Sequence, residues 1–191
     1  MAREQVKLKK AGPAAPLARG ALLIEGRVSQ DAWALLGDED EILAGADVVV
    51  SLARFKAERE TLLARNSGRL GVSIAPADAV EDIAEDVARF ATVFVQFPGF
   101  RDGRGYSSAR LLRERFGYTG ELRAIGDVLE DQIFYMLRCG FDAFELRGEH
   151  AEAIFARASK TFSVAYQSSA DAQAPAHVLR AQLRARGKAS E

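Results

Sequence analysis

Cysteine and histidine are nearly absent from this sequence. Its 191 residues include one cysteine, Cys139, and two histidines, His150 and His177. A single cysteine excludes an internal disulfide and any iron–sulfur or metal site built from several cysteines of the chain. The histidines lie in polar segments without the spacing of metal ligands, and we predict no metal site. Cys139 ends a predicted helix, where the helix dipole disfavours the thiolate, so we interpret it as a buried packing residue.

Long apolar runs are also missing. No uninterrupted stretch reaches the roughly 18 residues that a membrane helix requires. The basic N-terminus, MAREQVKLKKAG, is followed by two prolines rather than by the apolar region of a secretory signal. Apolar residues nevertheless make up 48% of the chain and charged residues 28%, as in ordinary soluble proteins. We therefore expect one domain with a full hydrophobic core, located in the cytoplasm.

Charge is distributed unevenly along the chain, although the net charge is only −1. Residues 1–20 carry a charge of +4, residues 168–191 carry +2, and the part between them carries −7. An acidic central part is unlike a nucleic-acid-binding domain, which presents a basic face. We expect residues 1–20 to be a disordered basic tail and residues 21–167 a single domain. Residues 168–191 are predicted to be a polar, alanine-rich tail with one short helix near residues 177–184.

Short apolar runs alternate with helical patterns along the central part. The predicted strands are Val48–Leu52, Leu70–Ile74, Thr92–Phe97, Glu121–Ile125, Ala143–Leu146 and Phe162–Gln167. Runs of this kind, separated by helices, indicate an α/β fold with a mostly parallel sheet covered on both faces. Five or six such units are too few for a complete barrel, which leaves an open sheet or a partial barrel. Residues 21–36 predict a small N-terminal β-hairpin, with Trp33 packing as an apolar cap on the domain.

The helices are predicted between these strands. They cover residues 53–65, 80–87, 106–116, 127–139 and 149–159. Asp78, with Glu81 three residues later, has the pattern of a capping box at the start of the second helix. Apolar residues at helical spacing follow it, which indicates one buried face.

The loop after the third predicted strand, PGFRDGRGYSS, is rich in arginine and glycine. A helix N-terminus attracts anions, glycine permits close approach of a ligand, and guanidinium groups match oxyanions. We interpret the loop as a site for phosphate, sulfate, sulfite or a carboxylate, formed by Arg101, Arg104, Gly105 and Ser107. In the alternative interpretation, Asp102 pairs with one of the arginines and holds a structural turn.

Asp127 follows the fourth predicted strand. Because sequential strands of a parallel sheet usually lie side by side, we expect Asp127 near Arg101 and Arg104 at the edge where the strands end. Arg123, on the fourth strand itself, is expected to contribute to the same anion site. Asp127 is predicted to act as a general base or to hold an arginine in position. The alternative role for Asp127 is the N-cap of the following helix.

Three segments resemble a known family. They read GRVSQDAWALL, FPGFRDGRGYSSARLLRERFGYTGELRAIGDVLEDQIFYMLRCGFDAFELR and FSVAYQ. Together they resemble an uncharacterised bacterial family, domain of unknown function 934, over about residues 21–167. Its members are often labelled oxidoreductases of sulfite reduction and are typically encoded beside a haem and iron–sulfur sulfite reductase. The resemblance implies a component of assimilatory sulfite reduction, either an oxidoreductase or an accessory protein, with sulfite reductase as a partner.

The resemblance leaves the chemistry open. It supplies no catalytic residues, and the sequence shows no dinucleotide fingerprint, cluster cysteines or flavin motif, so the cofactor is undetermined. A second hypothesis is a non-catalytic protein that docks on sulfite reductase through its acidic central part or Tyr106. A third is a lyase or isomerase on a partial barrel that acts on a phosphorylated metabolite.

Overall fold

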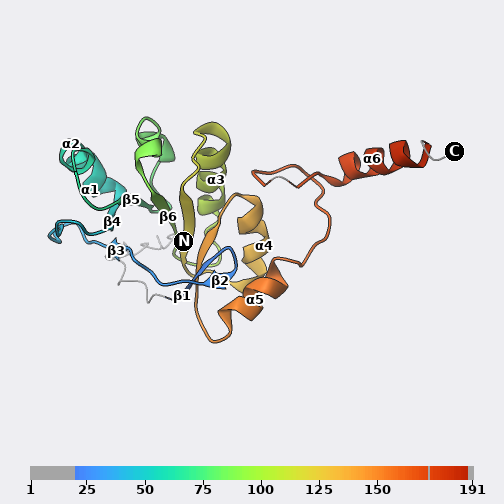
Figure 1. The fold of residues 1–191 in the computed structure, drawn as a ribbon, viewed down its shortest axis with the longest axis horizontal. Coiled ribbons are helices and arrows are strands. Elements are labelled where there is room, and N and C mark those ends of the chain that lie inside the picture. The colour runs from blue at the N-terminus through green and yellow to red at the C-terminus, as the bar shows by residue number, and fades with distance from the viewer. Residues whose placement is uncertain (1–19, 172, 189–191) are drawn as a thin grey trace, which may run out of the picture.

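The computed structural model describes residues 20–171 and 173–188. Its strands form one sheet in the order β2-β1-β8-β7-β6-β5-β4-β3, which curls into a half-barrel (Figure 1). The strands are β1 (Ala21–Ile24), β2 (Arg27–Val28), β3 (Ala34–Leu35), β4 (Val48–Ser51), β5 (Leu70–Ile74), β6 (Thr92–Phe97), β7 (Glu121–Gly126) and β8 (Ala143–Leu146). From β3 to β8 all neighbours are parallel, whereas β1 is antiparallel to β8 and β2. The predicted α/β fold, with a mostly parallel sheet and an N-terminal hairpin, is confirmed.

The predicted last strand, Phe162–Gln167, is wrong. This segment has no regular secondary structure, and the side chains of Phe162, Val164 and Tyr166 are all exposed. The reason is topological. β1 returns to pair with β8 on the side away from β7, so the place where a further parallel strand would add is already occupied. The alternating apolar residues of the segment therefore lie at the surface rather than in the sheet.

Helices are present at four of the five predicted places between the strands, and the first of these is divided into two. The helices are α1 (Leu52–Ala57), α2 (Arg59–Leu63), α3 (Arg104–Arg110), α4 (Glu130–Arg138), α5 (Ala151–Ala158) and α6 (Ala176–Lys188). A π-helical turn, Leu111–Arg115, extends α3. The predicted helix over residues 80–87 is replaced by two 3-10 turns, Val80–Ile83 and Val87–Arg89. Asp78 accepts a hydrogen bond from the Ala75 N–H at 2.8 Å, which closes a turn before this segment and leaves no capping box.

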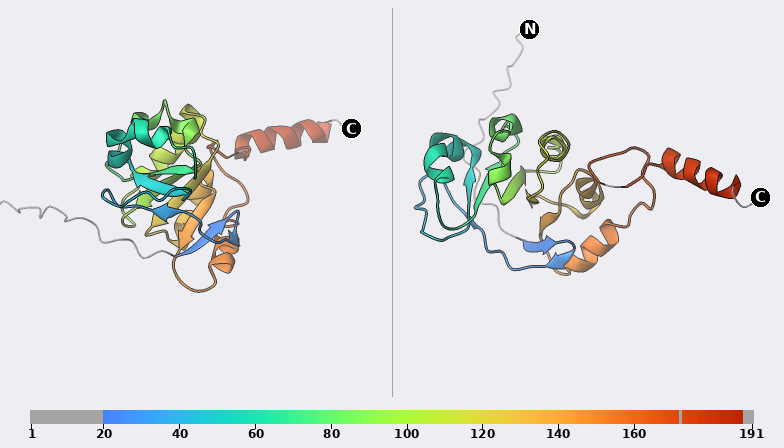
Figure 2. Two further views of the ribbon diagram at one scale, coloured as in Figure 1. Left: turned by 60° about the vertical axis from the view of Figure 1, so that its left-hand side comes forward. Right: turned by 45° about the horizontal axis from the view of Figure 1, so that its top comes forward.

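The two faces of the sheet bury different kinds of residue. The outer face packs against the helices, which lie in an arc around the curled sheet (Figure 2). The inner face holds a smaller apolar cluster of Trp33, Val49, Phe94 and Ile125. Trp33 reaches it from the segment between β2 and β4, which runs along the inner side of the sheet (Figure 2). The tryptophan therefore packs on the inside of the half-barrel.

The C-terminal helix α6 projects away from the domain (Figures 1 and 2). It follows an irregular segment that crosses the outer face, and it extends beyond the short helix expected near residues 177–184. The basic tail predicted for residues 1–20 lies, apart from Gly20, outside the described residues. None of the described helices is long and apolar enough to cross a membrane.

Candidate functional site

The arginine-rich loop lies, as expected, between the end of β6 and the start of α3. Arg104 forms a two-pronged ion pair with Asp102: Nε lies 2.9 Å from Oδ1 and Nη2 lies 2.7 Å from Oδ2. These hydrogen bonds hold the pKa of the Asp102 carboxyl below its usual value. Arg101 is exposed on the same loop. The pairing of Arg104 with Asp102 is the structural turn of the alternative interpretation, although both arginines remain at the surface.

Gly105 is buried because α3 approaches β6 closely at this residue. A Cβ atom built there would lie 2.6 Å from Phe97 Cζ and 3.0 Å from Val95 Cγ1. The next residue, Tyr106, packs edge-on against Phe97, with ring centroids 5.4 Å apart. Ser107 is exposed and borders a separate concavity between α3 and the neighbouring helix α4. The structure thus gives Gly105 a packing role and places Ser107 in a different concavity.

Asp127 lies where the sequence placed it, at the carboxyl edge of the sheet. Its N–H donates to the Phe97 carbonyl at 2.7 Å, so it sits directly beside the start of the arginine-rich loop. The helix after it begins at Glu130, three residues later than predicted, with Leu129 in the N-cap position. Asp127 is therefore not the N-cap. Its half-buried side chain remains part of the strand-end edge.

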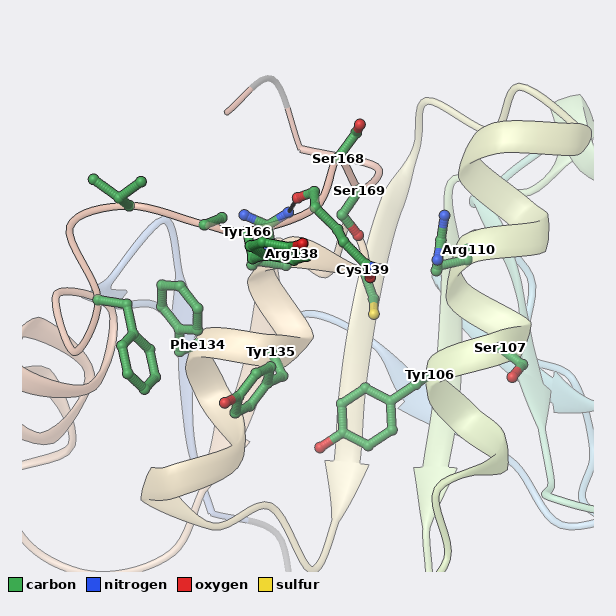
Figure 3. A pocket seen from close by; sticks show the side chains of 14 residues that line it. Tyr106, Ser107, Arg110, Phe134, Tyr135, Arg138, Cys139, Tyr166, Ser168 and Ser169 are labelled. Atoms are coloured by element: carbon green, nitrogen blue, oxygen red, sulfur yellow. Dashed lines mark hydrogen bonds between the residues drawn. The ribbon is translucent and has the colours of Figure 1, made fainter. Parts of the chain in front are cut away.

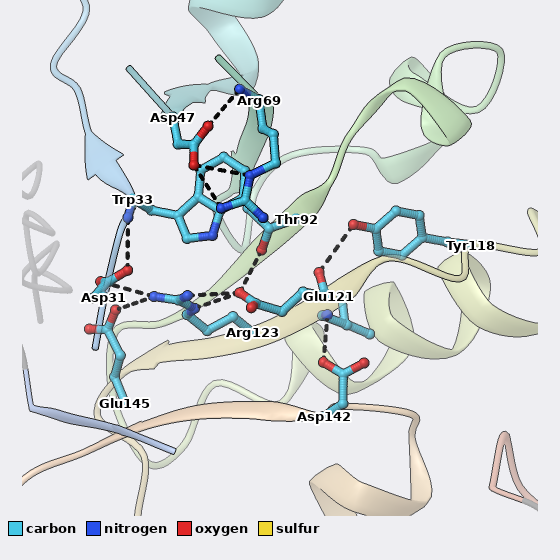
Figure 4. Close-up of polar contacts among 11 residues, drawn as sticks. Asp31, Trp33, Asp47, Arg69, Thr92, Tyr118, Glu121, Arg123, Asp142 and Glu145 are labelled. Carbon is cyan, nitrogen blue, oxygen red and sulfur yellow. Dashed lines mark hydrogen bonds and ion pairs between the residues drawn. The ribbon is translucent and has the colours of Figure 1, made fainter. Parts of the chain in front are cut away.

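Arg123 lies on the inner face of the sheet, away from the loop (Figure 4). Its side chain is 1% exposed, and its guanidinium carbon lies 4.3 Å from the centre of the Phe94 ring. Nη1 lies 3.0 Å from Asp31 Oδ2 and 3.5 Å from Glu145 Oε1, and Nη2 lies 2.8 Å from Glu121 Oε1. The three carboxylates come from β7, β8 and the segment that follows β2.

The position of Arg123 separates it from the other predicted anion ligands. It precedes the end of β7 at Gly126 by three residues, or about 10 Å of extended strand, and its guanidinium turns toward Glu121, farther from that edge. The structure therefore brings Asp127 next to the loop of Arg101 and Arg104, and it does not bring Arg123 there. Arg123 instead ties the segment that carries Asp31 to the sheet.

A large cleft opens on the outer face, between α3 and α4 (Figure 3). Its volume is about 740 Å³, within the range of ligand and peptide sites. We call it the α3–α4 cleft. One wall carries Tyr106, Ser107 and Arg110 from α3, a second carries Tyr135, Arg138 and Cys139 from α4 and its end, and the segment from Phe162 to Ser169 forms the rim.

Arg138 holds that rim in place. Its guanidinium donates to the Gln167 carbonyl and, at 3.3 Å, to Gln173 Oε1, and it lies 3.6 Å from Asp171. Two aromatic side chains nevertheless extend into solvent at the cleft: Tyr135 is 53% exposed and Tyr166 is 84% exposed. Exposed aromatic residues concentrated around a concavity are typical of a binding surface.

Two titratable groups of the α3–α4 cleft, Tyr106 and Cys139, have raised pKa values that favour their neutral forms. Burial, with the nearby charge of Asp131, raises the pKa of Tyr106 to about 12. Burial also raises the pKa of the Cys139 thiol, against the opposing effect of Arg110. Cys139 is thus a neutral, half-buried thiol in the cleft wall, close to the packing role predicted for it. Among the described residues, no group of three or more His, Cys, Asp or Glu side chains could hold a metal ion.

The cleft does not follow from the sequence, because the segment that forms its rim has a misleading pattern. The alternation of Phe162, Val164 and Tyr166 predicts a strand, although these residues form the rim. The exposure of Tyr135 follows from its position opposite the buried Ile133 on α4, and the sequence contains this signal. Nothing in the sequence predicts that α3 and α4 are separated by a gap.

A model of a bacterial protein family of unknown function (DUF934) matches residues 71–177. This range includes every residue that lines the α3–α4 cleft, and it ends within the first turn of α6. No curated protein matches the chain. The match confirms the family resemblance noted in the sequence.

Proposed function

Because this chain belongs to the DUF934 family, we propose that it is a non-catalytic accessory component of assimilatory sulfite reduction, which docks on sulfite reductase. The family resemblance supports the pathway. The observation that carries the docking role is the α3–α4 cleft, which lies wholly inside the part of the chain that the family model covers. Its exposed rings provide the rigid, amphipathic contact area that protein interfaces favour.

The docking role predicts a loss of affinity when aromatic residues of the cleft are truncated. The double variant Tyr135→Ala, Tyr166→Ala is expected to bind sulfite reductase at least about 10-fold more weakly, since interface aromatics each contribute about 1–2 kcal/mol or more. Binding is measured by surface plasmon resonance with the purified reductase at low salt. Both side chains are largely exposed, so the fold should be unaffected.

Phe100 supplies the matched control. It is an aromatic residue 58% exposed on the loop after β6, outside the cleft, and Phe100→Ala should leave the affinity unchanged. Absence of any association with the reductase would contradict the proposed function. Equal binding by the double variant and the natural chain would remove the cleft from it.

A second candidate function is oxyanion binding at the loop after β6, favoured by the exposure of both arginines there. The Arg104 side chain is 61% exposed, and an anion would have to take the place of Asp102 on its guanidinium. Sulfite, sulfate or phosphate at ten times the dissociation constant would stabilise the fold by about 1.4 kcal/mol, which corresponds to a rise in Tm of about 3 °C. The rise should vanish in Arg104→Ala.

The melting experiment is controlled with sodium chloride at the same ionic strength, because screening alone alters surface ion pairs. Arg157→Ala provides the matched variant, since Arg157 forms a similar exposed ion pair with Glu130, far along the chain from the loop. An unchanged Tm in millimolar oxyanion would refute an anion site in this loop.

A further inference from the structure

The C-terminal helix α6 has no surface of its own to pack on. Beyond its first turn it makes no hydrogen bond or ion pair to the rest of the described chain, and it projects from the domain (Figures 1 and 2). Leu183, near its middle, is 68% exposed. A 13-residue helix is marginal in water without tertiary packing. We therefore expect this helix to be stabilised by packing its leucines against another surface.

One face of α6 has the pattern of a helix that binds in a groove. Ala176, Leu179 and Leu183 recur at i, i+3 and i+7, which places them in one stripe about 10 Å long. Arg180 and Arg184 lie along one side of this stripe and are exposed. The described helix contains no acidic residue.

The α3–α4 cleft has the complementary shape and chemistry. Two helices that face each other across a gap line it, with tyrosine rings from both sides (Figure 3). One carboxylate without a partner among the described ion pairs, that of Asp131, lies near enough to Tyr106 to raise its pKa. The two arginines that line the cleft are already paired, Arg110 with Glu114 at 2.8 Å and Arg138 with Asp171 at 3.6 Å. Asp131 therefore suits the arginines of α6, and the rings suit its leucines.

The cleft of the same molecule is out of reach for α6. The N–H of Ala176, the first residue of the helix, donates at 2.7 Å to the carbonyl of Ala165, which lies in the cleft rim. The helix starts at the rim and runs outward from it, so entering its own cleft would require the chain to reverse and this bond to break. A second copy meets no such restriction.

We propose that two copies of this chain form a dimer in which each α6 lies in the α3–α4 cleft of the other. The exchange is reciprocal, so a single two-fold axis generates two equal contacts. Leu179 and Leu183 enter between the tyrosines, and the arginines beside them, Arg180 and Arg184, lie on the side of Asp131. The inference rests on the cleft as a docking surface, as the proposed function does, and sulfite reductase then competes with α6 for it.

The oligomeric state of the purified full chain tests the proposal by sedimentation velocity. The natural chain is expected to sediment as a dimer and Leu183→Asp as a monomer. Ala181→Asp is the matched control, because it adds the same charge to the same helix about 200° away from Leu183. This control should remain dimeric. A monomeric Leu183→Asp variant would then reflect the loss of the apolar contact and not unfolding of the helix.

The reciprocal arrangement gives a sharper readout. Tyr135→Asp damages the cleft and leaves α6 intact, so it should also be monomeric on its own. An equimolar mixture of Tyr135→Asp and Leu183→Asp should regain a mixed dimer, since one intact helix meets one intact cleft. A monomeric natural chain, a dimeric Leu183→Asp variant, or a mixture that stays monomeric would each overturn the exchange.

Binding of sulfite reductase distinguishes the two proposals. Monomeric Leu183→Asp has an open cleft and should bind the reductase at least as tightly as the natural chain does. If the reductase binds but no α6-dependent dimer exists, the exchange fails and the docking function stands. If the dimer behaves as described but the reductase does not bind, the docking function fails alone.

Discussion

Replacement of Arg123 by alanine is expected to lower the free energy of unfolding by about 3–5 kcal/mol, with a fall in Tm of about 10 °C. Arg123 pairs with Asp31, Glu121 and Glu145 on the inner face. Its removal takes the guanidinium away from Glu121, two residues earlier on the same strand, inside the sheet. Urea unfolding followed by circular dichroism measures the change.

Arg157→Ala provides the comparison for this experiment. Arg157 also pairs with a carboxylate, at 2.5 Å from Glu130, but its side chain is 67% exposed. Exposed pairs contribute about 0–1 kcal/mol, so this variant should unfold almost like the natural chain. If both variants lose the same small amount, the buried cluster does not hold the Asp31 segment on the sheet.

Gly105→Ala is expected to destabilise the fold by about 1–3 kcal/mol through overpacking. Alanine is otherwise preferred over glycine inside a helix by about 1 kcal/mol, so a loss of stability must come from the contact with Phe97. The added Cβ would lie 2.6 Å from the ring of Phe97 and would push α3 away from β6. Thermal and urea unfolding measure the effect.

Gly103→Ala is the matched substitution, two residues earlier. Its nearest neighbour to a Cβ would be Tyr106 at 3.8 Å, and its φ of −88° suits any residue. Its stability should change by no more than about 0.5 kcal/mol. If Gly105→Ala were as stable as Gly103→Ala, the packing role of Gly105 would be refuted and close approach of a ligand would become the better explanation.

The sheet could be predicted from the sequence because its signals are local. Thr92–Phe97 and Ala143–Leu146 are apolar runs too short for helices, and the structure has strands with the same bounds. The failure at Phe162–Gln167 has a non-local cause, since only the return of β1 beside β8 removes its place in the sheet. The 3-10 turns after Asp78 depend on a side-chain hydrogen bond that competes with the helix cap.

The candidate site was only partly predictable. Asp127 and the arginine-rich loop lie together at the strand ends, as parallel topology requires. The orientation of Arg123 depends on its register opposite Phe94 and on the placement of Asp31, neither of which the sequence determines. The strand ELRAIG did contain one clue. Glu121 and Arg123 are two residues apart and therefore share a face, which favours a local ion pair over a ligand site.

The two outermost strands of the sheet, β2 and β3, contain only two residues each. A long free edge lets a foreign strand add to a sheet, and this is a common start of fibril growth. Here each edge strand offers the unpaired backbone groups of only two residues. At the β2 edge, the N–H of Val28 already donates to Glu152 at 2.8 Å. Both margins are therefore poor templates for β-augmentation. Contacts with other molecules are therefore made by side-chain surfaces. Unlike the addition of strands to a sheet edge, such contacts do not continue from one molecule to the next without limit.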